Sequence, residues 1–153
     1  MTEISFHFNA PDRLNYACRL LRKTANGAAR IAVTGSPEVL AAVDTLLWAV
    51  SPTDFIAHCF ADDSPSMVAA SPVVLGQPVP SATAEASGLD ALTRTVLVNL
   101  GDGVPPGFES FERLAELVGT DESNRQLARE RWKYYASRGY TMITHDLATK
   151  STS

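Results

Sequence analysis

The sequence has no long apolar run and few cysteines, and both features narrow the classes of protein to which it can belong. A membrane-spanning helix needs about 20 consecutive apolar residues, and no stretch of the 153 residues approaches that length. The first residues, MTEISFHFNAPDRL, show no basic segment followed by an apolar one, as a secretory signal would. Cys18 and Cys59 are too few for a disulfide framework. We therefore expect a cytoplasmic protein with reduced thiols and no membrane contact.

The sequence also lacks the motifs with which many enzymes bind phosphate or metal, or activate a nucleophile. Neither GxGxxG nor GxxxxGK[ST] occurs, and TGSPE offers only a single helix N-terminus. His7, His58, His145 and the two cysteines show no metal-ligand spacing. No Ser, His and Asp residues form a nucleophile motif. The sequence thus predicts no catalytic residues, no metal and no cofactor.

Positive charge is scarce in the chain and is concentrated near its two ends. The formal net charge is −4 and the isoelectric point is near 5.3. Between Arg30 and Arg113 the only basic residue is Arg94. Broad electrostatic binding of nucleic acid requires a basic surface that displaces counterions. The charge distribution argues against that mode of binding.

The first half of the chain alternates between strand and helix patterns. Residues 3–8 and 29–35 read as strands, and residues 9–26 and 37–50 as amphipathic helices that follow them. This order is typical of a right-handed βαβ unit in a parallel sheet. The predicted fold is α/β, with three α/β/α layers and helices on both faces of a largely parallel sheet. Its topology would be Rossmann-like but without a phosphate-binding loop, in a single domain that spans residues 1–153.

The second half of the chain has weaker patterns. The expected strands lie at 73–75, at 94–100 and, as an edge strand, at 140–145. A mobile loop is expected at about 76–91, which is rich in Ala, Ser and Pro, and a frayed tail at about 147–153. Residues 108–119 predict an amphipathic helix whose inward side chains are Phe111, Leu114, Ala115 and Val118.

The stretch 121–140 predicts a helix that is the best candidate for a binding surface. Asp121 or Thr120 can cap its start, and Gly139 can end it. At about 100° per residue, one side carries Arg125, Arg129, Trp132, Lys133 and Ala136. The expected buried face carries Leu127, Tyr134 and Tyr135. The basic side can pair with a carboxylate and seat an apolar ring against Trp132, although an ordinary solvated helix surface has a similar composition.

Trp48 is a second unusual feature, because it falls on the side of its helix opposite the apolar face. A following loop with Phe55 and Phe60 can cover the indole, or the indole can remain exposed for a partner. The sequence leaves both alternatives open. A groove edged by Trp48 and Phe55 would suit a partner helix.

Several segments, in the same order over nearly the whole chain, resemble the chi subunit of bacterial DNA polymerase III. They are NYACRLLRKTANGAARIAV, VDTLLW followed by SPTDFIAH, VLVNL and, above all, QLARERWKYYASRGY. The resemblance implies a subunit of a DNA-directed DNA polymerase (nucleotidyltransferase) holoenzyme that has no catalysis of its own. Such a subunit joins the psi subunit of the clamp loader. It also holds the acidic, phenylalanine-ended C-terminal tail of the single-stranded DNA-binding protein, and so contacts DNA only indirectly.

The resemblance also assigns residues to the two binding sites. It places the tail site on Arg125, Arg129, Trp132 and Lys133, and the psi site on Trp48 and Phe55. Arg125 stands where the family can have a lysine and Trp132 where it can have a tyrosine, and both residues keep the chemistry. The alternative hypothesis is a stand-alone nucleotide-binding or nucleic-acid-binding α/β protein.

Overall fold

The computed structural model describes residues 2–10, 12–26, 31–49, 58–60, 73–76, 96–101, 103–105, 108 and 111–146. Its elements are β1 (Glu3–Ala10), α1 (Arg13–Asn26), β2 (Ile31–Thr34), α2 (Pro37–Ala49), β3 (His58–Phe60), β4 (Val73–Leu75), β5 (Val96–Asn99), β6 (Arg113–Gly119), α5 (Glu122–Ser137) and β7 (Met142–Asp146). The predicted loop at about 76–91 and tail at about 147–153 lie outside the described residues, apart from Gly76.

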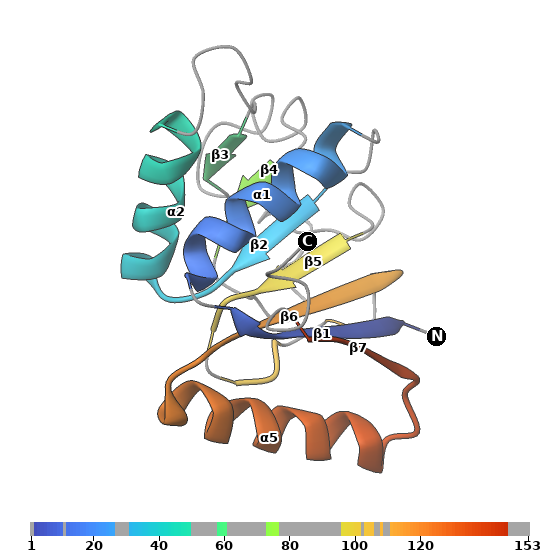
Figure 1. The fold of residues 1–153 in the computed structure, drawn as a ribbon. Coiled ribbons are helices and arrows are strands. Elements are labelled where there is room, and N and C mark those ends of the chain that lie inside the picture. The colour runs from blue at the N-terminus through green and yellow to red at the C-terminus, as the bar shows by residue number, and fades with distance from the viewer. Residues whose placement is uncertain are drawn as a thin grey trace.

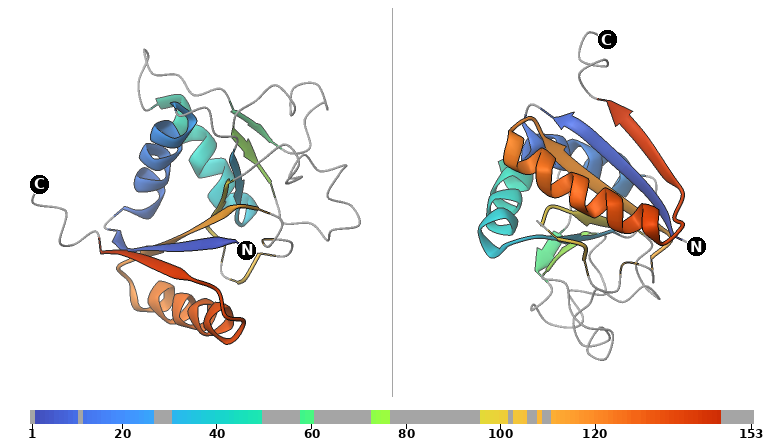
Figure 2. Two further views of the ribbon diagram at one scale, coloured as in Figure 1. Left: turned by 90° about the vertical axis from the view of Figure 1, so that its right-hand side faces the viewer. Right: turned by 90° about the horizontal axis from the view of Figure 1, so that it is seen from below.

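The strands form one parallel sheet that lies between two layers of helix. The seven strands follow the order β3-β4-β2-β5-β6-β1-β7, and every pairing between them is parallel. Helices α1 and α2 cover one face, and α5 covers the other (Figures 1 and 2). The predicted three-layer α/β fold is therefore confirmed. β1 and β2 are not neighbours, since β5 and β6 lie between them, so α1 crosses two strand positions.

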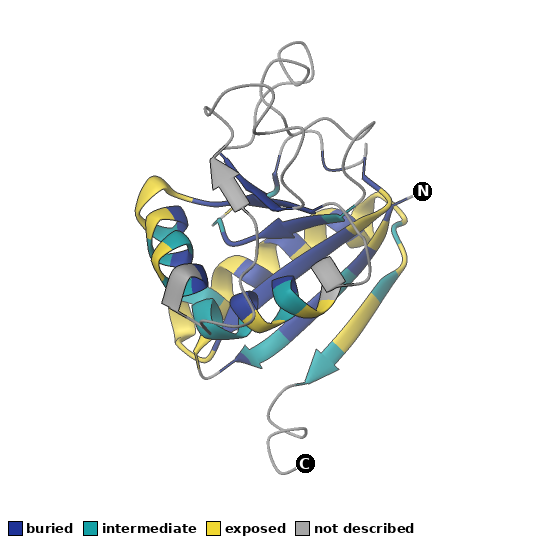
Figure 3. Cartoon of the chain, turned by 90° about the horizontal axis from the view of Figure 1, so that it is seen from above, coloured by how far each residue is buried: buried dark blue, intermediate teal, exposed yellow. Residues whose placement is uncertain are grey.

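Each face of the sheet has its own apolar core, because successive residues of a strand point to opposite faces. Under α1 and α2, the helix residues Ala17, Cys18, Leu21, Leu40, Val43 and Leu47 pack with Ile31, Val33, Val98 and Leu117. Under α5, Ala128 and Tyr135 pack with Ile4, Phe6, Leu97, Leu114 and Val118. The buried residues run through the central strands and along the inner sides of the helices (Figure 3). The apolar faces predicted for the first two helices are thus confirmed.

The helix predicted at 108–119 is wrong, because this segment contains strand β6 between β5 and β1. Leu114 and Val118 belong to the core under α5, and Ala115 and Leu117 to the core under α1 and α2. A strand covered on both faces is apolar at nearly every position, so it shows no alternation. Glu116 interrupts this run and gives the sequence an apparent helical period.

The described edge at β7 agrees with the predicted edge strand at 140–145. β7 pairs with β1 over Met142–Asp146, and the order of the sheet ends there. Ile143 and Thr144 are exposed. None of the described helices is long and apolar enough to cross a membrane.

Substitution of Leu117 by alanine tests the strand assignment of β6. Leu117 is fully buried in the core under α1 and α2, so Leu117→Ala should reduce the free energy of unfolding by about 2–5 kcal/mol. The exposed Glu112, next to the same strand, provides the control, and Glu112→Ala should change stability by less than about 0.5 kcal/mol. Urea unfolding followed by circular dichroism measures both. A Leu117→Ala protein as stable as the Glu112→Ala protein would contradict the assignment.

Candidate functional site

Helix α5 begins and ends at the residues that the sequence predicts. Asp121 accepts hydrogen bonds from the backbone N–H of Asn124 at 3.1 Å and from Ser123 Oγ at 2.9 Å. These bonds hold the pKa of Asp121 below its ordinary value, and the bond from Ser123 has the largest effect. At the other end Gly139 has a φ of +79°, a conformation that disfavours other residues. The cap and the stop are both confirmed.

The buried face of α5 differs from the expected one. The residues turned toward the sheet are Ala128, Arg131 and Tyr135. Leu127 is 38% exposed and Tyr134 37% exposed, so their predicted burial is wrong, whereas that of Tyr135 is right. The predicted buried face consisted of Leu127, Tyr134 and Tyr135 and did not include Arg131. Arg131 is turned inward because strand β6 provides it with a charged partner.

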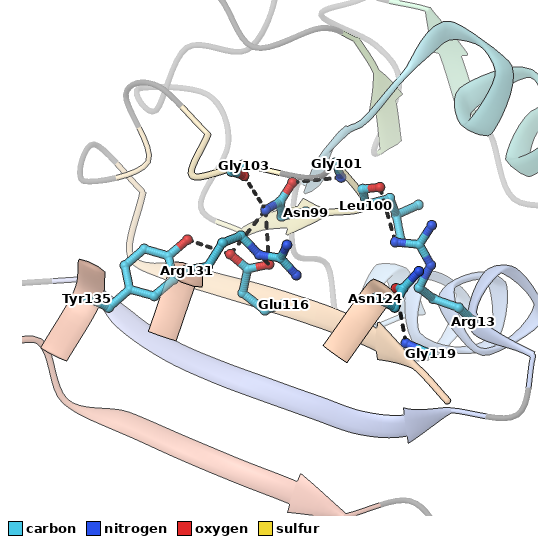
Figure 4. A network of polar contacts seen from close by, with 10 residues as sticks. All are labelled: Arg13, Asn99, Leu100, Gly101, Gly103, Glu116, Gly119, Asn124, Arg131 and Tyr135. Carbon is cyan, nitrogen blue, oxygen red and sulfur yellow. Dashed lines mark hydrogen bonds and ion pairs between the residues drawn. The ribbon is translucent and has the colours of Figure 1, made fainter. Parts of the chain in front are cut away.

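That partner is Glu116, a fully buried carboxylate in the middle of β6 (Figure 4). Arg131 Nε donates to Glu116 Oε1 at 2.8 Å, and the Tyr135 hydroxyl donates to Oε2. Asn99 Nδ2, on β5, lies 3.0 and 3.1 Å from the two carboxylate oxygens. Asn99 Oδ1 in turn accepts the backbone N–H of Gly101 at 2.9 Å. Four polar side chains thus join two strands to α5.

All of these neighbours donate hydrogen bonds to Glu116, which indicates that it is ionised. Burial raises the pKa of Glu116, and the charge of Arg131 together with the bonds from Tyr135, Asn99 and Arg131 opposes this increase. Arginine stays protonated in proteins. Burial also raises the pKa of Tyr135, which therefore remains a donor. The network contains one negative and one positive charge, and all four of its side chains are buried.

The inward position of Arg131 and Tyr135 determines which residues lie on each flank of α5. At about 100° per residue, Arg125, Arg129 and Trp132 fall together on one flank, and Leu127 and Tyr134 on the other. On the first flank there is a groove of about 340 Å³ between α5 and the strands. Its lining residues are Phe6, Phe8, Asn9, Val118, Arg125, Ala128, Arg129, Trp132 and Thr144.

The groove brings together three of the four residues predicted for the tail site, namely Arg125, Arg129 and Trp132. Lys133 does not line it. Lys133 is exposed on α5 with Nζ 3.9 Å from a Glu130 carboxylate oxygen. Ala136 is exposed and also lies outside the lining.

The two arginines of the groove have different partners. Arg129 Nη1 lies 3.3 Å from Glu122 Oε1, and both side chains are exposed. Such surface pairs contribute about 0–1 kcal/mol, so another carboxylate can replace Glu122. Arg125 Nη2 donates to the amide oxygen of Asn9 at 2.7 Å. Both guanidinium groups can therefore pair with a carboxylate of a ligand.

The inner wall of the groove is apolar and aromatic. Phe6 lies beneath Trp132, with ring centroids 5.1 Å apart and planes at 61°, an edge arrangement. Val118 and Ala128 are buried beside them. Trp132 itself is 37% exposed, so one part of the indole packs on the sheet and another faces the groove. The groove thus offers an apolar surface next to two cations.

The strand residues that line the groove were not part of the site predicted from the sequence. Phe6 and Phe8 have the same parity along β1, which was a usable signal that they share a face. Nothing in the sequence indicated that α5 would lie over them, because β1 and α5 are far apart along the chain. Thr144 and Val118 were missed for the same reason.

The structure gives only the backbone position of one psi-site residue. Trp48 lies in α2, and its side chain is outside the description, as is the whole of Phe55. The sheet-facing residues of α2 are Leu40, Val43 and Leu47. The assignment of Trp48 and Phe55 to a partner surface remains a prediction.

The described titratable groups elsewhere offer no catalytic arrangement. Burial, and then the charge of Asp12, raises the pKa of Cys18 to about 11, so this thiol is protonated and unreactive at neutral pH. On the sheet face opposite the groove, His7 Nδ1 lies 2.6 Å from the Tyr16 hydroxyl, and His7 stacks on His145 at 4.6 Å. Within the described ranges no group of three or more His, Cys, Asp or Glu residues could hold a metal ion.

Comparison with known proteins gives one family. The family model described as DNA polymerase III chi subunit, HolC, matches residues 1–143. A protein of Pseudomonas aeruginosa named DNA polymerase III subunit chi is 29% identical over 152 residues, which cover 96% of this chain and 98% of the relative. A protein of Haemophilus influenzae with the same name is 22% identical over 132 residues, which cover 86% and 85% of the two chains.

Removal of the arginine from the buried pair should give a stability loss that depends on pH. In Arg131→Met the positive charge that opposes the burial of Glu116 is gone, so the folded-state pKa of Glu116 rises further above the ordinary value of 4.5. The hydrogen bonds from Tyr135 and Asn99 remain. Stability should be retained near pH 4.5 and should fall as the pH rises through the folded-state pKa. Relative to wild type, we expect a loss of about 3–5 kcal/mol at neutral pH. Urea unfolding at the two pH values measures it.

The double variant Glu116→Gln/Arg131→Met is the control for this experiment. It has no buried charge, so at neutral pH it should be more stable than Arg131→Met alone. An equal loss at both pH values, with no recovery in the double variant, would show that Arg131 contributes through packing and not through its charge.

Proposed function

The chain belongs to the DNA polymerase III chi subunit family, which makes it a DNA-replication subunit, and we propose that it acts as a non-catalytic adaptor. In this role the groove beside α5 binds the acidic C-terminal tail of the single-stranded DNA-binding protein. Trp48, which lies in α2, and Phe55 bind the psi subunit of the clamp loader. The protein would thereby link the clamp loader to the single-stranded DNA-binding protein in the cytoplasm and would contact DNA only indirectly.

The observation that carries the proposal is the combination of two accessible guanidinium groups with an apolar wall in one groove. A tail that has several carboxylates and ends in phenylalanine with a free carboxylate matches both features. The planar guanidinium of Arg129 can donate two parallel hydrogen bonds to a carboxylate. The phenylalanine ring can pack against Trp132 and Phe6, whose own rings contact each other in the wall of the groove.

The exposure of the charged residues supports a modest and salt-sensitive affinity. Arg129 is 62% exposed and pairs with Glu122, which the ligand must displace. Contacts of this type should give a dissociation constant on the order of micromolar, which corresponds to a binding free energy of about −8 kcal/mol. Salt should weaken binding because charges at an exposed rim are screened. Lys133 is 75% exposed outside the groove, so it adds long-range attraction to the acidic tail.

The positions of the two sites support simultaneous binding of both partners. Helix α2 lies on one face of the sheet, and α5 lies on the other (Figure 2). A tail peptide in the groove is therefore separated from a psi helix at α2 by the sheet itself. An adaptor needs this arrangement, because a partner that blocked the other site would compete with it instead of being linked to it.

Variants of the groove test the tail site. Arg129→Ala removes charge-assisted hydrogen bonds of about 1.5–3 kcal/mol, so binding of the tail peptide should weaken at least about tenfold. Trp132→Ala should weaken binding by removing the wall for the ring. Lys133→Ala should have a smaller effect than Arg129→Ala. The measurement is titration of a labelled tail peptide at two salt concentrations, with circular dichroism to verify that the variants are folded.

Lys23→Ala is the matched control for charge. It changes the net charge by the same amount as Arg129→Ala, but Lys23 is exposed on α1, across the sheet from the groove. The affinity of the Lys23→Ala protein for the tail peptide should equal that of wild type. If Arg129→Ala and Trp132→Ala also bind like wild type, the tail binds elsewhere.

Substitutions in α2 test the psi site. Trp48→Ala should weaken psi binding at least about thirtyfold, because an anchor residue of an interface commonly contributes about 2 kcal/mol or more. Its melting temperature should change little. The neighbouring Leu47 is buried, so Leu47→Ala should lower the melting temperature instead. Binding measured by calorimetry separates the two outcomes, and a Trp48→Ala protein that loses its fold would show that Trp48 belongs to the core.

A further inference from the structure

Asn9 has an unusual backbone conformation at one end of the groove. Its φ is 62°, and it is the one residue other than glycine with a positive φ in the described ranges. The pairing of β1 with β6 shifts register between His7 and Ala10, around this residue. Asparagine tolerates the left-handed conformation better than most residues. The local irregularity turns the Asn9 side chain toward the groove, where it is one of the lining residues.

The carboxamide of Asn9 lies between a cation and an anion. Its Oδ1 accepts a hydrogen bond from Arg125 Nη2 at 2.7 Å, and its Nδ2 donates to Asp146 Oδ1 at 2.9 Å. Asp146 is the last residue of β7 and pairs in register with Phe8, the neighbour of Asn9. One neutral amide thus uses its acceptor for Arg125 and its donor for Asp146.

This arrangement affects how much of the charge of Arg125 a ligand can use. Among the described residues Arg125 forms no ion pair, although the Asp146 carboxylate binds the same amide. A direct Arg125–Asp146 pair would offset the charge of Arg125 and occupy its donors. The amide instead fixes one guanidinium nitrogen and leaves the positive charge without a paired anion.

We propose that Asn9 is a positioning residue of the groove, which holds the Arg125 guanidinium at the mouth and keeps it apart from Asp146, so that Arg125 can bind a ligand carboxylate. This inference rests on the proposed binding of an acidic tail in the groove. Asn9 acts through Arg125 and does not need to touch the ligand itself. The ligand chemistry is the same as before, a carboxylate of an acidic peptide.

Two substitutions separate the amide from the backbone conformation. Asn9→Gly keeps access to a positive φ but removes the amide, so Asp146 can pair with Arg125. Asn9→Asp also keeps the conformation accessible, but it places a carboxylate next to Arg125 and leaves Asp146 without its donor from residue 9. Asp146→Asn removes the competing charge and retains an acceptor for Asn9 Nδ2.

The experiment is titration of a labelled peptide that has several aspartates and ends in phenylalanine with a free carboxylate. Asn9→Gly should weaken binding about tenfold or more, since one charge-assisted contact is lost. Asn9→Asp should weaken it at least as much and should reduce its salt dependence, because one cation no longer takes part. Asp146→Asn should bind within about twofold of wild type, because Asp146 does not line the groove and its substitution removes no ligand contact.

The double variant Asn9→Gly/Asp146→Asn provides the decisive comparison. It should recover binding to within about twofold of wild type, because the residue that captures Arg125 is gone. A purely structural role of Asn9 predicts no such recovery. Unchanged binding by Asn9→Gly, or a double variant as weak as Asn9→Gly, would overturn the role of Asn9 while leaving the tail site intact. A wild-type protein that does not bind the peptide would overturn the tail site and this inference together.

Discussion

The buried contact between Glu116 and Arg131 is the constraint on which the candidate site depends. A carboxylate inside a covered sheet is tolerated only when donors surround it, and Arg131, Tyr135 and Asn99 supply these donors from α5 and β5. The pair adds little net stability compared with an apolar pair of the same volume. It does penalise any rotation or shift of α5 that separates the two charges. The network therefore fixes the orientation of α5 on the sheet more strictly than apolar packing alone.

The orientation of α5 in turn decides the chemistry of the surface beside it. With Arg131 and Tyr135 inward, Arg125, Arg129 and Trp132 face the open part of β1 and β7. Phe6 belongs to the core under α5, Phe8 is partly buried against that core, and both also line the groove. A rotation by one residue position, about 100°, would move these three side chains out of the groove, either toward solvent or into the sheet. The candidate binding surface therefore depends on the buried charge beneath it.

Sequence patterns predicted those features that depend on neighbours along the chain. The cap at Asp121, the stop at Gly139 and the apolar faces of α1 and α2 follow from local spacing, and so does the basic flank of α5. Features that depend on contacts across the sheet were not predictable in this way. Leu127 and Tyr134 were expected inside and Arg131 was not among the residues expected there. The partner of Arg131 lies in β6, a strand for which the sequence pattern predicted a helix. The positive φ of Asn9 likewise depends on how β1 pairs with β6.

Three arginines within two turns of α5 show that the partner of a residue, and not its type, determines its role. Arg131 has a buried carboxylate as its partner, and separating such a pair costs about 3–5 kcal/mol. Arg129 pairs with an exposed carboxylate that contributes about 0–1 kcal/mol, and Arg125 binds a neutral amide. A ligand carboxylate can displace the exposed partner of Arg129 and can pair with the charge that the amide leaves on Arg125. It cannot compete with the buried partner of Arg131. The same side chain is thus structural at one position and available for recognition at the two others, and burial of the partner makes the difference.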